Sequence, residues 1–289
     1  MRRAATRRLF IAASWSSKLS ENMPNVERLR CEPYSAVVGA GQDLCSATRC
    51  LHGRVAVVTG ASSGIGRAIA IALAKQGVQL CIVGRDADRL GETAAVAQHF
   101  SSVKNFQLDL TGEEQLQPLV QHLEQESGGL DILIHSAGVI CEDLMERSRI
   151  EDLDLQYATN LRGPYLLTRR LLPTLTNTRG QIVFINSSAG LTAKRADIGQ
   201  YAATKHALKA IADSLREEVN PKGIRVLTVY LGRTATPMQE SLHRQEGRDY
   251  HPGALLQPED VASVIVQSLM LPPTAEVTDI SLRPMMNSW

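Results

Sequence analysis

From Arg54 onward, short aliphatic runs alternate with longer stretches of helical periodicity, and this alternation restricts the fold more than any other feature. The runs lack polar alternation, so we expect strands that are covered on both faces. Strands that alternate with helices are typical of βαβ units and a parallel sheet. The expected strands cover 55–58, 80–83, 106–108, 132–134, 182–185, 226–229 and a short 280–282, and the expected helices cover 64–77, 86–98, 112–127, 150–176, 200–219 and 258–270.

Helix boundary signals agree with this alternation. Gly77 follows the first expected helix as a stop, and Pro258 with the acids after it suits a helix start. Segments 143–149 and 233–256 are expected to form loops or short helices. We therefore predict an α/β fold, a single doubly wound parallel sheet with helices on both faces.

The first part of the chain differs from the rest, so we divide the sequence into an extension, 1–52, and one domain, 53–289. The first twenty residues carry five basic side chains and no acid, a composition that resembles an organellar targeting peptide. A start at Met23, or a disordered tail, fits the same residues. We expect a cytoplasmic protein, with a mitochondrial or other organellar location as the alternative if residues 1–22 act as a targeting peptide.

Composition excludes several classes of function. The net charge is +1, from 31 basic and 30 acidic side chains, so nothing points to nucleic acid as a partner. The five cysteines lack the paired spacing of metal ligands, so no metal is expected and the thiols are interpreted as reduced. No apolar run reaches the roughly 18 residues that a membrane-spanning helix requires, so we expect a soluble protein.

A glycine-rich turn follows the first expected strand and opens the first expected helix, the context in which such a turn binds phosphate. Its glycines allow unusual backbone angles and the close approach of a pyrophosphate, while the helix offers free backbone N–H groups. An ordinary tight turn is the alternative. We predict a dinucleotide site that uses Thr59, Gly60, Ser62, Ser63, Gly64, Ile65 and Gly66.

Tyr201 and Lys205 stand four residues apart in an expected helix, so their side chains share one face. A free tyrosine has a pKa of about 10, and a nearby ammonium favours the phenolate. This pair therefore provides an acid/base group that can work near neutral pH. Ser188 lies thirteen positions upstream.

Taken together, residues 59–66, Ser188, Tyr201 and Lys205 resemble the short-chain dehydrogenase/reductase family in its classical branch, and the likeness covers nearly everything after residue 53. The resemblance implies a Rossmann-type fold. It also implies that Tyr201 is the catalytic acid/base, that Lys205 lowers its pKa and binds the nicotinamide ribose, and that Asn160 completes a proton relay. By the family spacing, Ser188 rather than Ser187 holds the substrate oxygen.

The same resemblance implies further cofactor contacts. Asp109 matches the family acid near the adenine, although a strand-end cap is the local alternative. His135 and Ser136 replace the usual asparagines, while Leu231 replaces a usual proline. The remaining implied contacts are Ala137, Gly138, Gly232, Thr234 and Thr236, together with Asn160, Tyr201 and Lys205.

The end of the second expected strand indicates which nicotinamide cofactor is used. An acid there binds the ribose 2′-hydroxyl of NAD, but this chain has Gly84 followed by Arg85. A guanidinium can hold a 2′-phosphate through two hydrogen bonds. Asp86 complicates the pattern unless it caps the next helix and turns away. NADP(H) is therefore favoured over NAD(H).

The sequence thus predicts an NADP(H)-dependent oxidoreductase that interconverts an alcohol and a ketone or aldehyde. The alternatives are an NAD-dependent alcohol dehydrogenase and a non-catalytic NADP(H)-binding regulator. Basic residues such as Arg244 and Arg248 leave open an acidic substrate, or simply a solvated loop. The family also implies a homo-oligomer, formed through helices 150–176 and 200–219.

Overall fold

The computed structural model describes residues 51–125 and 127–285, so nearly all of the N-terminal extension lies outside the described residues. In the described residues, seven parallel strands form one sheet in the order β3-β2-β1-β4-β5-β6-β7. The predicted doubly wound α/β fold is confirmed. The strands are β1 (Val55–Thr59), β2 (Gln79–Gly84), β3 (Val103–Gln107), β4 (Ile132–His135), β5 (Gln181–Ser187), β6 (Arg225–Leu231) and β7 (Asp279–Leu282).

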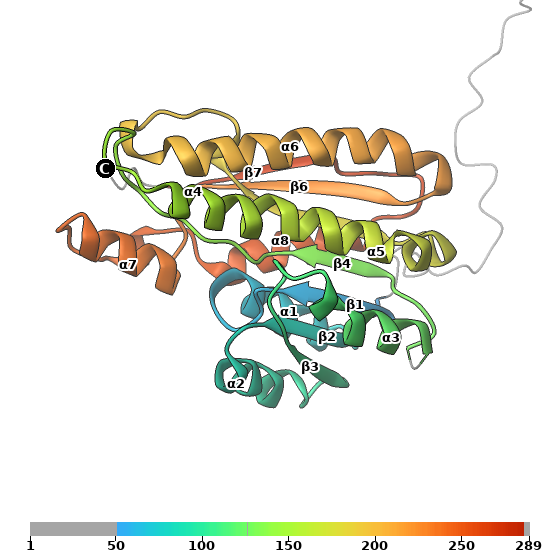
Figure 1. Ribbon diagram of the computed structural model, residues 1–289. Coiled ribbons are helices and arrows are strands. Elements are labelled where there is room, and N and C mark those ends of the chain that lie inside the picture. The colour runs from blue at the N-terminus through green and yellow to red at the C-terminus, as the bar shows by residue number, and fades with distance from the viewer. Residues whose placement is uncertain (1–50, 126, 286–289) are drawn as a thin grey trace, which may run out of the picture. The chain divides into compact units, whose positions relative to one another are not determined.

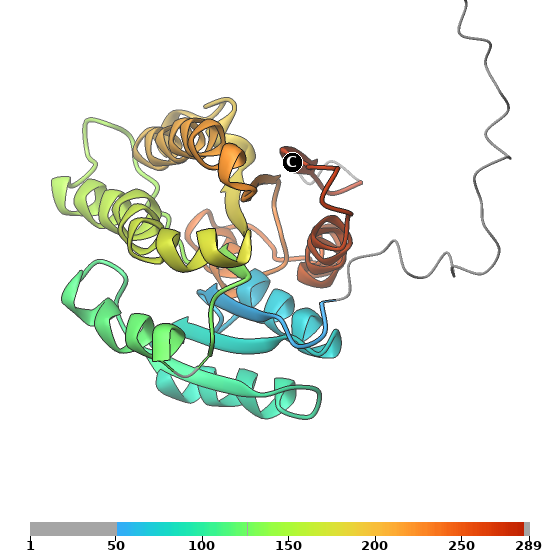
Figure 2. The ribbon, with the colours of Figure 1, turned by 90° about the vertical axis from the view of Figure 1, so that its right-hand side faces the viewer.

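Helices cover both faces of this sheet, as Figures 1 and 2 show from two directions. The first face carries α1 (Gly64–Lys75), α2 (Ala87–Ala97) and α8 (Pro258–Leu269). The second face carries α3 (Gln117–Gln125), α5 (Gly163–Thr178) and α6 (Gly199–Val219). A further short helix, α4 (Ile150–Tyr157), leads into α5.

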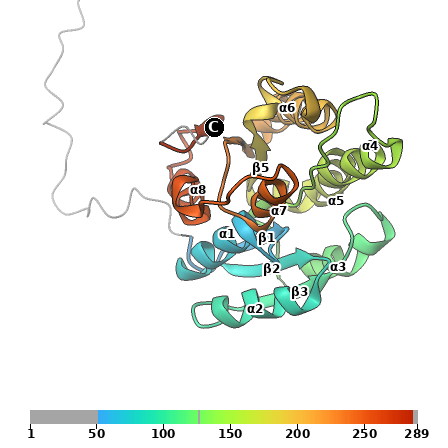
Figure 3. The ribbon, with the colours of Figure 1, turned by 90° about the vertical axis from the view of Figure 1, so that its left-hand side faces the viewer.

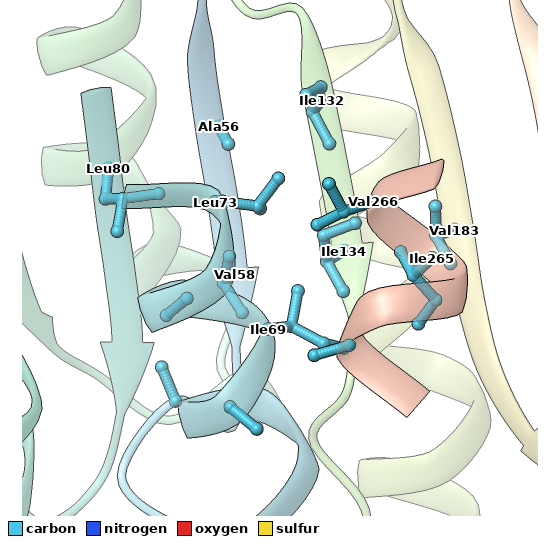
Figure 4. Close-up of a cluster of buried hydrophobic side chains, with 14 of the residues drawn as sticks. Ala56, Val58, Ile69, Leu73, Leu80, Ile132, Ile134, Val183, Ile265 and Val266 are labelled. Atoms are coloured by element: carbon cyan, nitrogen blue, oxygen red, sulfur yellow. The ribbon is translucent and has the colours of Figure 1, made fainter. Parts of the chain in front are cut away.

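The core beneath α1 and α8 shows why the central strands contain almost only aliphatic residues. Figure 4 shows Ile69 and Leu73 of α1 and Ile265 of α8 over side chains from β1, β4 and β5. All three helix residues are fully buried. Since the other face of the same strands is covered by a second apolar cluster, a polar residue has no solvated side to occupy. Leu51 also belongs to the first cluster, so the buried core includes a residue that the sequence division assigned to the extension.

Both boundary signals are confirmed. Gly77 has a φ of 76°, the left-handed conformation that ends a helix, and α1 stops two residues earlier. Pro258 occupies the first turn of α8, with Glu259 and Asp260 beside it.

Two elements differ from the prediction. The third strand begins at Val103 rather than near Phe106, because β3 is an edge strand whose exposed polar residues interrupt the aliphatic run. The single helix expected over 150–176 is divided by a π-helical turn, Ala158–Arg162, between α4 and α5. The segment 233–256 contains a short helix, α7 (Pro237–Gln245), as expected.

The carboxyl ends of the parallel strands meet at one edge of the sheet, and α7 projects there (Figures 1 and 3). The chain reverses its direction of winding between β1 and β4, which are neighbours in the sheet. Crevices at such a reversal bind ligands in open α/β sheets, so this edge is where a site is expected. Within 51–125 and 127–285, no helix is both long and apolar enough to cross a membrane.

Candidate active site

The glycine turn lies at the reversal between β1 and β4, and its backbone is shaped for close approach. Gly60 and Gly64 have φ angles of 67° and 52°. A Cβ on Gly66 would lie 2.3 Å from the carbonyl oxygen of Gly60, so only glycine fits this position. Ser63 is the N-cap of α1 yet makes no side-chain capping bond, and the first turn holds no acid. The N–H groups of this helix end therefore suit an anionic phosphate.

Thr59 links this turn to β4 through hydrogen bonds. Its hydroxyl donates to the carbonyl of Ile134 and accepts from the amides of Ser136 and Ala137, at 3.0 to 3.2 Å. The side chain is fully buried. Thr59 thus positions the turn, and its contact with a dinucleotide remains a prediction.

β2 ends next to a cationic rather than an acidic side chain. The side chain of Asp86 is the N-cap of α2 and accepts from the amide of Arg89 at 3.1 Å, which confirms the expected cap. Arg85 is exposed, and its carbonyl accepts a bond from Gln107. A Cβ on Gly84 would lie 2.2 Å from the hydroxyl oxygen of Ser62, so glycine leaves room for that serine. Ser62 therefore lies against Gly84, the residue before Arg85.

Asp109 follows β3 at the same edge of the sheet. One of its carboxylate oxygens accepts from the amide of Thr111 at 2.9 Å, so the local capping role proposed from sequence is present. The residue is half-buried. Contact with an adenine remains a prediction.

Tyr201 and Lys205 lie on one face of α6, as their spacing predicts. The Lys205 ammonium is 5.7 Å from the centre of the Tyr201 ring and donates to the carbonyl of Ile185 at 3.2 Å. Burial lowers the pKa of Lys205 to about 8. Burial also raises the pKa of Tyr201 to about 12, partly offset by a hydrogen bond with Ser187. The protein alone thus holds Tyr201 as a neutral phenol at physiological pH, opposite to the lowered value expected from sequence.

The serine beside Tyr201 is Ser187, whereas the choice of Ser188 from spacing stays a prediction. Ser187 is the last residue of β5 and makes a side-chain hydrogen bond with Tyr201. Ser188 begins the following 3₁₀ turn and is exposed. Neighbouring residues at a strand end point to opposite sides, so both serines cannot face the phenol. Asn186 stabilises this arrangement because its amide group donates to the carbonyl of Lys205 at 3.1 Å.

Asn160 lies in the π-helical turn, and its side chain is fully engaged. Its amide oxygen accepts from the Val139 amide at 2.8 Å, while its nitrogen donates to the Val139 carbonyl and to Thr204. A buried polar group that bonds neighbouring backbone is the local alternative to the proton relay that the family resemblance implies, and these backbone bonds are present. The bonds fix the loop after β4, where a Cβ on Gly138 would lie 3.4 Å from the Asn160 amide oxygen and 3.8 Å from the Lys205 ammonium.

His135 has a structural role in β4. Its ring is stacked on Phe184 with centroids 4.8 Å apart, and Nε2 is 2.8 Å from the Thr168 hydroxyl. Burial lowers the pKa of His135 to about 3, so the ring is neutral in the folded protein. It therefore supports β4 without adding a charge to the site.

The segment 232–236, which follows β6, packs against the glycine turn. Thr236 caps α7 by accepting from the Gln239 amide, and its methyl group lies 3.0 Å from a Cβ placed on Gly64. The Thr234 hydroxyl donates to the Gly232 carbonyl at 3.1 Å. The predicted cofactor residues from 59–66 and 232–236 are thus brought together at one edge of the sheet.

A group of ion pairs among the loops that follow β4 and β5 was not identified from the sequence. It joins Glu142 of the loop after β4, Arg195 and Asp197 of the loop after β5, and Glu246 at the end of α7. These residues line a cleft of about 520 Å³. They lie in loops without periodicity or motif, so no sequence signal connected them. Within the described part of the chain, no group of three or more His, Cys, Asp or Glu residues could hold a metal ion.

Proteins of similar sequence are dehydrogenases and oxidoreductases, which agrees with a site that is shaped for a dinucleotide. A family model described as short chain dehydrogenase matches residues 54–247. An uncharacterized oxidoreductase of Staphylococcus saprophyticus is 32% identical over 238 residues, which cover 81% of this chain and 98% of that protein.

Solved structures with a similar fold include two nucleotide complexes. The L-sorbose reductase of Gluconobacter frateurii, complexed with NADPH and L-sorbose, has a TM-score of 0.73 at 26% identity, covering 80% of this chain and 95% of that one. An alcohol dehydrogenase of Thermococcus sibiricus, complexed with 5-hydroxy-NADP, has a TM-score of 0.72 at 26% identity, covering 80% and 97%.

Proposed function

Since the chain belongs to the short-chain dehydrogenases and is an NAD(P)-dependent oxidoreductase, we propose that it interconverts an alcohol and a ketone or aldehyde with NADP(H) and uses Tyr201 as the acid/base. The observation that carries this proposal is the cluster of Tyr201, Lys205 and Ser187 beside a glycine turn shaped for a dinucleotide.

The residues suit a nicotinamide dinucleotide. The helix end at Ser63 and the close contact between Gly60 and Gly66 leave the backbone accessible to a pyrophosphate. We assign Gly60, Ser62, Ser63, Gly64, Ile65 and Gly66 to the phosphate side, Asp109 and Ala137 to the adenosine side, and Gly138, Gly232, Thr234 and Thr236 to the nicotinamide side. When bound, the nicotinamide supplies or accepts the hydride, and the protein has one proton to manage.

Tyr201 manages that proton. In carbonyl reduction its phenol donates a proton to the substrate oxygen, and its high pKa keeps the phenol protonated until this step. The Lys205 ammonium then stabilises the phenolate, because an opposite charge favours the ionised form. Lys205 is charged below its pKa of about 8, so both groups have the required protonation states at neutral pH.

Ser187 and Asn160 are the other two residues that we consider for a catalytic role. We assign to Ser187 the role that spacing gave to Ser188, because it is the serine that bonds Tyr201, and its single O–H can turn from the phenol to the substrate oxygen when substrate binds. The Asn160 side chain is engaged by Val139 and Thr204, so any part in a proton relay falls to the backbone of its π turn.

The preference for NADP(H) rests on charge at the end of β2. Arg85 is exposed and follows Gly84, whose backbone lies against Ser62, whereas the nearest acid in sequence, Asp86, is occupied as a helix cap. A guanidinium and a hydroxyl suit a 2′-phosphate and give no advantage to a 2′-hydroxyl. The NADPH and NADP analogue in the two structural neighbours support the same choice.

Screening alcohols and carbonyl compounds with all four nicotinamide cofactors tests the proposal. We expect carbonyl reduction with NADPH at a kcat/KM at least tenfold above that with NADH. Tight NADPH binding without turnover of any compound would instead favour a nucleotide-binding regulator. A higher kcat/KM with NADH would favour the NAD-dependent alcohol dehydrogenase.

We also propose that the chain forms a homo-oligomer. We keep the proposed division into an N-terminal extension, 1–52, and one domain, 53–289. Tyr157 and Tyr165, near the π turn, are half exposed at 50% and 52%, as expected for residues that a second copy covers. Light scattering of purified protein distinguishes a monomer from a homo-oligomer. We retain a cytoplasmic location for the mature protein, which fractionation of cells that express the full chain can test.

A further inference from the structure

A fully buried glutamine, Gln156, lies in the last turn of α4, which packs beside α6 (Figure 3). A buried amide group costs free energy unless its oxygen accepts and its nitrogen donates a hydrogen bond. The Gln156 oxygen accepts from the backbone amide of Cys141 at 3.1 Å, and its nitrogen donates to the side-chain oxygen of Gln200 at 3.1 Å. The side chain therefore forms a bridge from the loop after β4 to the first turn of α6.

Backbone groups at both ends fix the direction of these bonds. A backbone N–H only donates, so the amide group of Gln156 must turn its oxygen toward Cys141. At the other end, the nitrogen of Gln200 donates to the carbonyl of Arg149 at 3.2 Å, and a carbonyl only accepts. The bridge thus has one arrangement of its amide groups, which suits a contact that holds two segments at a fixed distance.

A second bridge runs from the same loop to α6. Asn160 bonds both backbone groups of Val139 and donates to the hydroxyl of Thr204 at 3.2 Å. That hydroxyl donates to the carbonyl of Tyr201 at 2.8 Å. Asn160 and Thr204 are buried. On α6 the two bridges therefore end at Gln200 and Thr204, on either side of Tyr201.

The two bridges join the segments whose spacing matters for the proposed reaction. Tyr201 and Lys205 on α6 manage the proton, and the loop after β4 contains Gly138, which we assign to the nicotinamide side. A Cβ on Gly138 would lie 3.8 Å from the Lys205 ammonium, so the loop and the helix meet here. Hydride and proton transfer need both segments in place, and a displacement of about 1 Å can lower a rate about a hundredfold.

We propose that Gln156 is a positioning residue, which sets the distance between the loop after β4 and the helix that carries Tyr201. It acts through Cys141 and Gln200 rather than on the reacting atoms. The inference rests on the proposed use of Tyr201 for the proton. Without this bridge the loop keeps its bonds to Asn160 but is no longer held at Cys141, so the reacting groups lose their alignment while the glycine turn keeps its shape.

Gln156→Met and Gln181→Met are a matched pair of variants. Both replace a buried glutamine by an apolar side chain of similar length. Gln181 is 7% exposed and donates to the Leu269 carbonyl at 3.0 Å. It begins β5, whose 7 residues span about 20 Å and end at Ser187 beside Tyr201. Gln181→Met therefore removes a buried hydrogen bond far from the candidate site.

Both substitutions should lower the midpoint of thermal unfolding by about 2–10 °C, because each leaves a partner group without its bond. Gln156→Met should also lower kcat for carbonyl reduction about ten- to a hundredfold, with the Kd for NADPH changed by less than about threefold. Gln181→Met should keep kcat within about twofold of wild type. Equal losses of kcat in the two variants, or an unchanged kcat in Gln156→Met, would overturn the inference.

Amide hydrogen exchange tests the bridge without turnover. In Gln156→Met, the Cys141 amide should exchange at least about tenfold faster than in wild type, because its acceptor is lost. The Val139 amide keeps Asn160 as its acceptor, so its exchange should change by less than about threefold. Exchange of the Cys141 amide at the wild-type rate would also overturn the inference.

The two readouts separate failure of this inference from failure of the proposed function. A wild-type protein that turns over no carbonyl compound would reject the function, and the exchange rate of the Cys141 amide would then decide the inference. If Gln156→Met does not fold, Gln200→Met removes the same bridge from a half-buried position. The same fall in kcat is expected of that variant, and a wild-type kcat there would contradict the positioning role.

Discussion

The two sides of the candidate site are built in different ways. The cofactor side is made of backbone: glycines between 60 and 66, an uncapped helix end, and a strand that ends in Gly84. The other side, in the loops after β4 and β5 and at the end of α7, is made of charged side chains, in which Glu142, Arg195 and Glu246 meet from positions about 50 residues apart. Backbone geometry leaves a local mark in the sequence, whereas an ion pair between distant loops leaves none. An NAD(P) cofactor is therefore predictable from the chain, and the substrate is not.

The largest effect should come from a side chain at Gly66, which fills the space that the glycine turn needs. Gly66→Ala would place a methyl group 2.3 Å from the Gly60 carbonyl oxygen, so the turn must shift. We expect NADPH affinity to fall by more than about a hundredfold, with a loss of stability of about 1–3 kcal/mol from overpacking. Fluorescence titration with NADPH and thermal unfolding measure these effects.

Gly91→Ala is the matched control for this glycine. Gly91 lies inside α2 with nothing within 4 Å of the added methyl group, so the substitution should stabilise the protein by about 0.5–1 kcal/mol. Unchanged NADPH binding by Gly66→Ala would show that the turn does not form the cofactor site.

The next largest effect compares the two adjacent serines. Ser187→Ala should lower kcat for carbonyl reduction about a hundredfold, because it removes the hydroxyl that bonds Tyr201. Ser188→Ala should change kcat by less than about threefold, since Ser188 is exposed. Steady-state kinetics of both variants on one ketone decide between them, and the reverse ranking would restore the assignment from spacing.

A smaller effect is expected from the charge at the end of β2. Arg85→Asp should raise the KM for NADPH about ten- to a hundredfold, because a charge-assisted bond to the 2′-phosphate becomes a repulsion. The KM for NADH should change by no more than about threefold. Arg89→Asp, a charge reversal four residues away, is the control and should alter neither value strongly. Equal changes for both cofactors in Arg85→Asp would contradict the 2′-phosphate contact.

The smallest effect is a change with pH. Lys205 has a lowered pKa of about 8, so its ammonium is present below pH 8 and is lost as the pH rises through that value. The Tyr201 phenol stays protonated over the same range because its pKa is raised to about 12. We expect kcat for reduction to fall several-fold between pH 7 and pH 9.5 at saturating NADPH. A rate that stays constant to pH 9.5 would mean that the charge of Lys205 does not assist the phenol.

Much of the fold could be predicted because each strand and helix carries its own local signal. Gly77 and Pro258 marked helix boundaries, and the buried strands were visible as aliphatic runs. The start of β3 was missed because an edge strand keeps polar residues. The π turn at Asn160 was missed because its cause is tertiary: the side chain of Asn160 bonds Val139, 21 residues away.

In the candidate site, too, features with a local sequence signal could be predicted, and features set by tertiary contacts could not. Spacing along α6 identified Tyr201 and Lys205, because a helix has a fixed period. Spacing across the loop between Ser188 and Tyr201 is a weaker guide, because a loop has no fixed period and one extra residue exchanges one serine for the next. The pKa of Tyr201 also differed from the expectation, since burial was not visible in the sequence and outweighs the nearby charge.

The central claim is that the Tyr201 phenol transfers the proton while hydride is exchanged. Tyr201→Phe removes one oxygen from a half-buried side chain, so the fold and NADPH binding should be retained. In a single turnover of NADPH-loaded protein with excess ketone, followed by NADPH absorbance, we predict a rate at least about a thousandfold below that of wild type. A rate within about tenfold of wild type, with NADPH affinity unchanged, would contradict the claim.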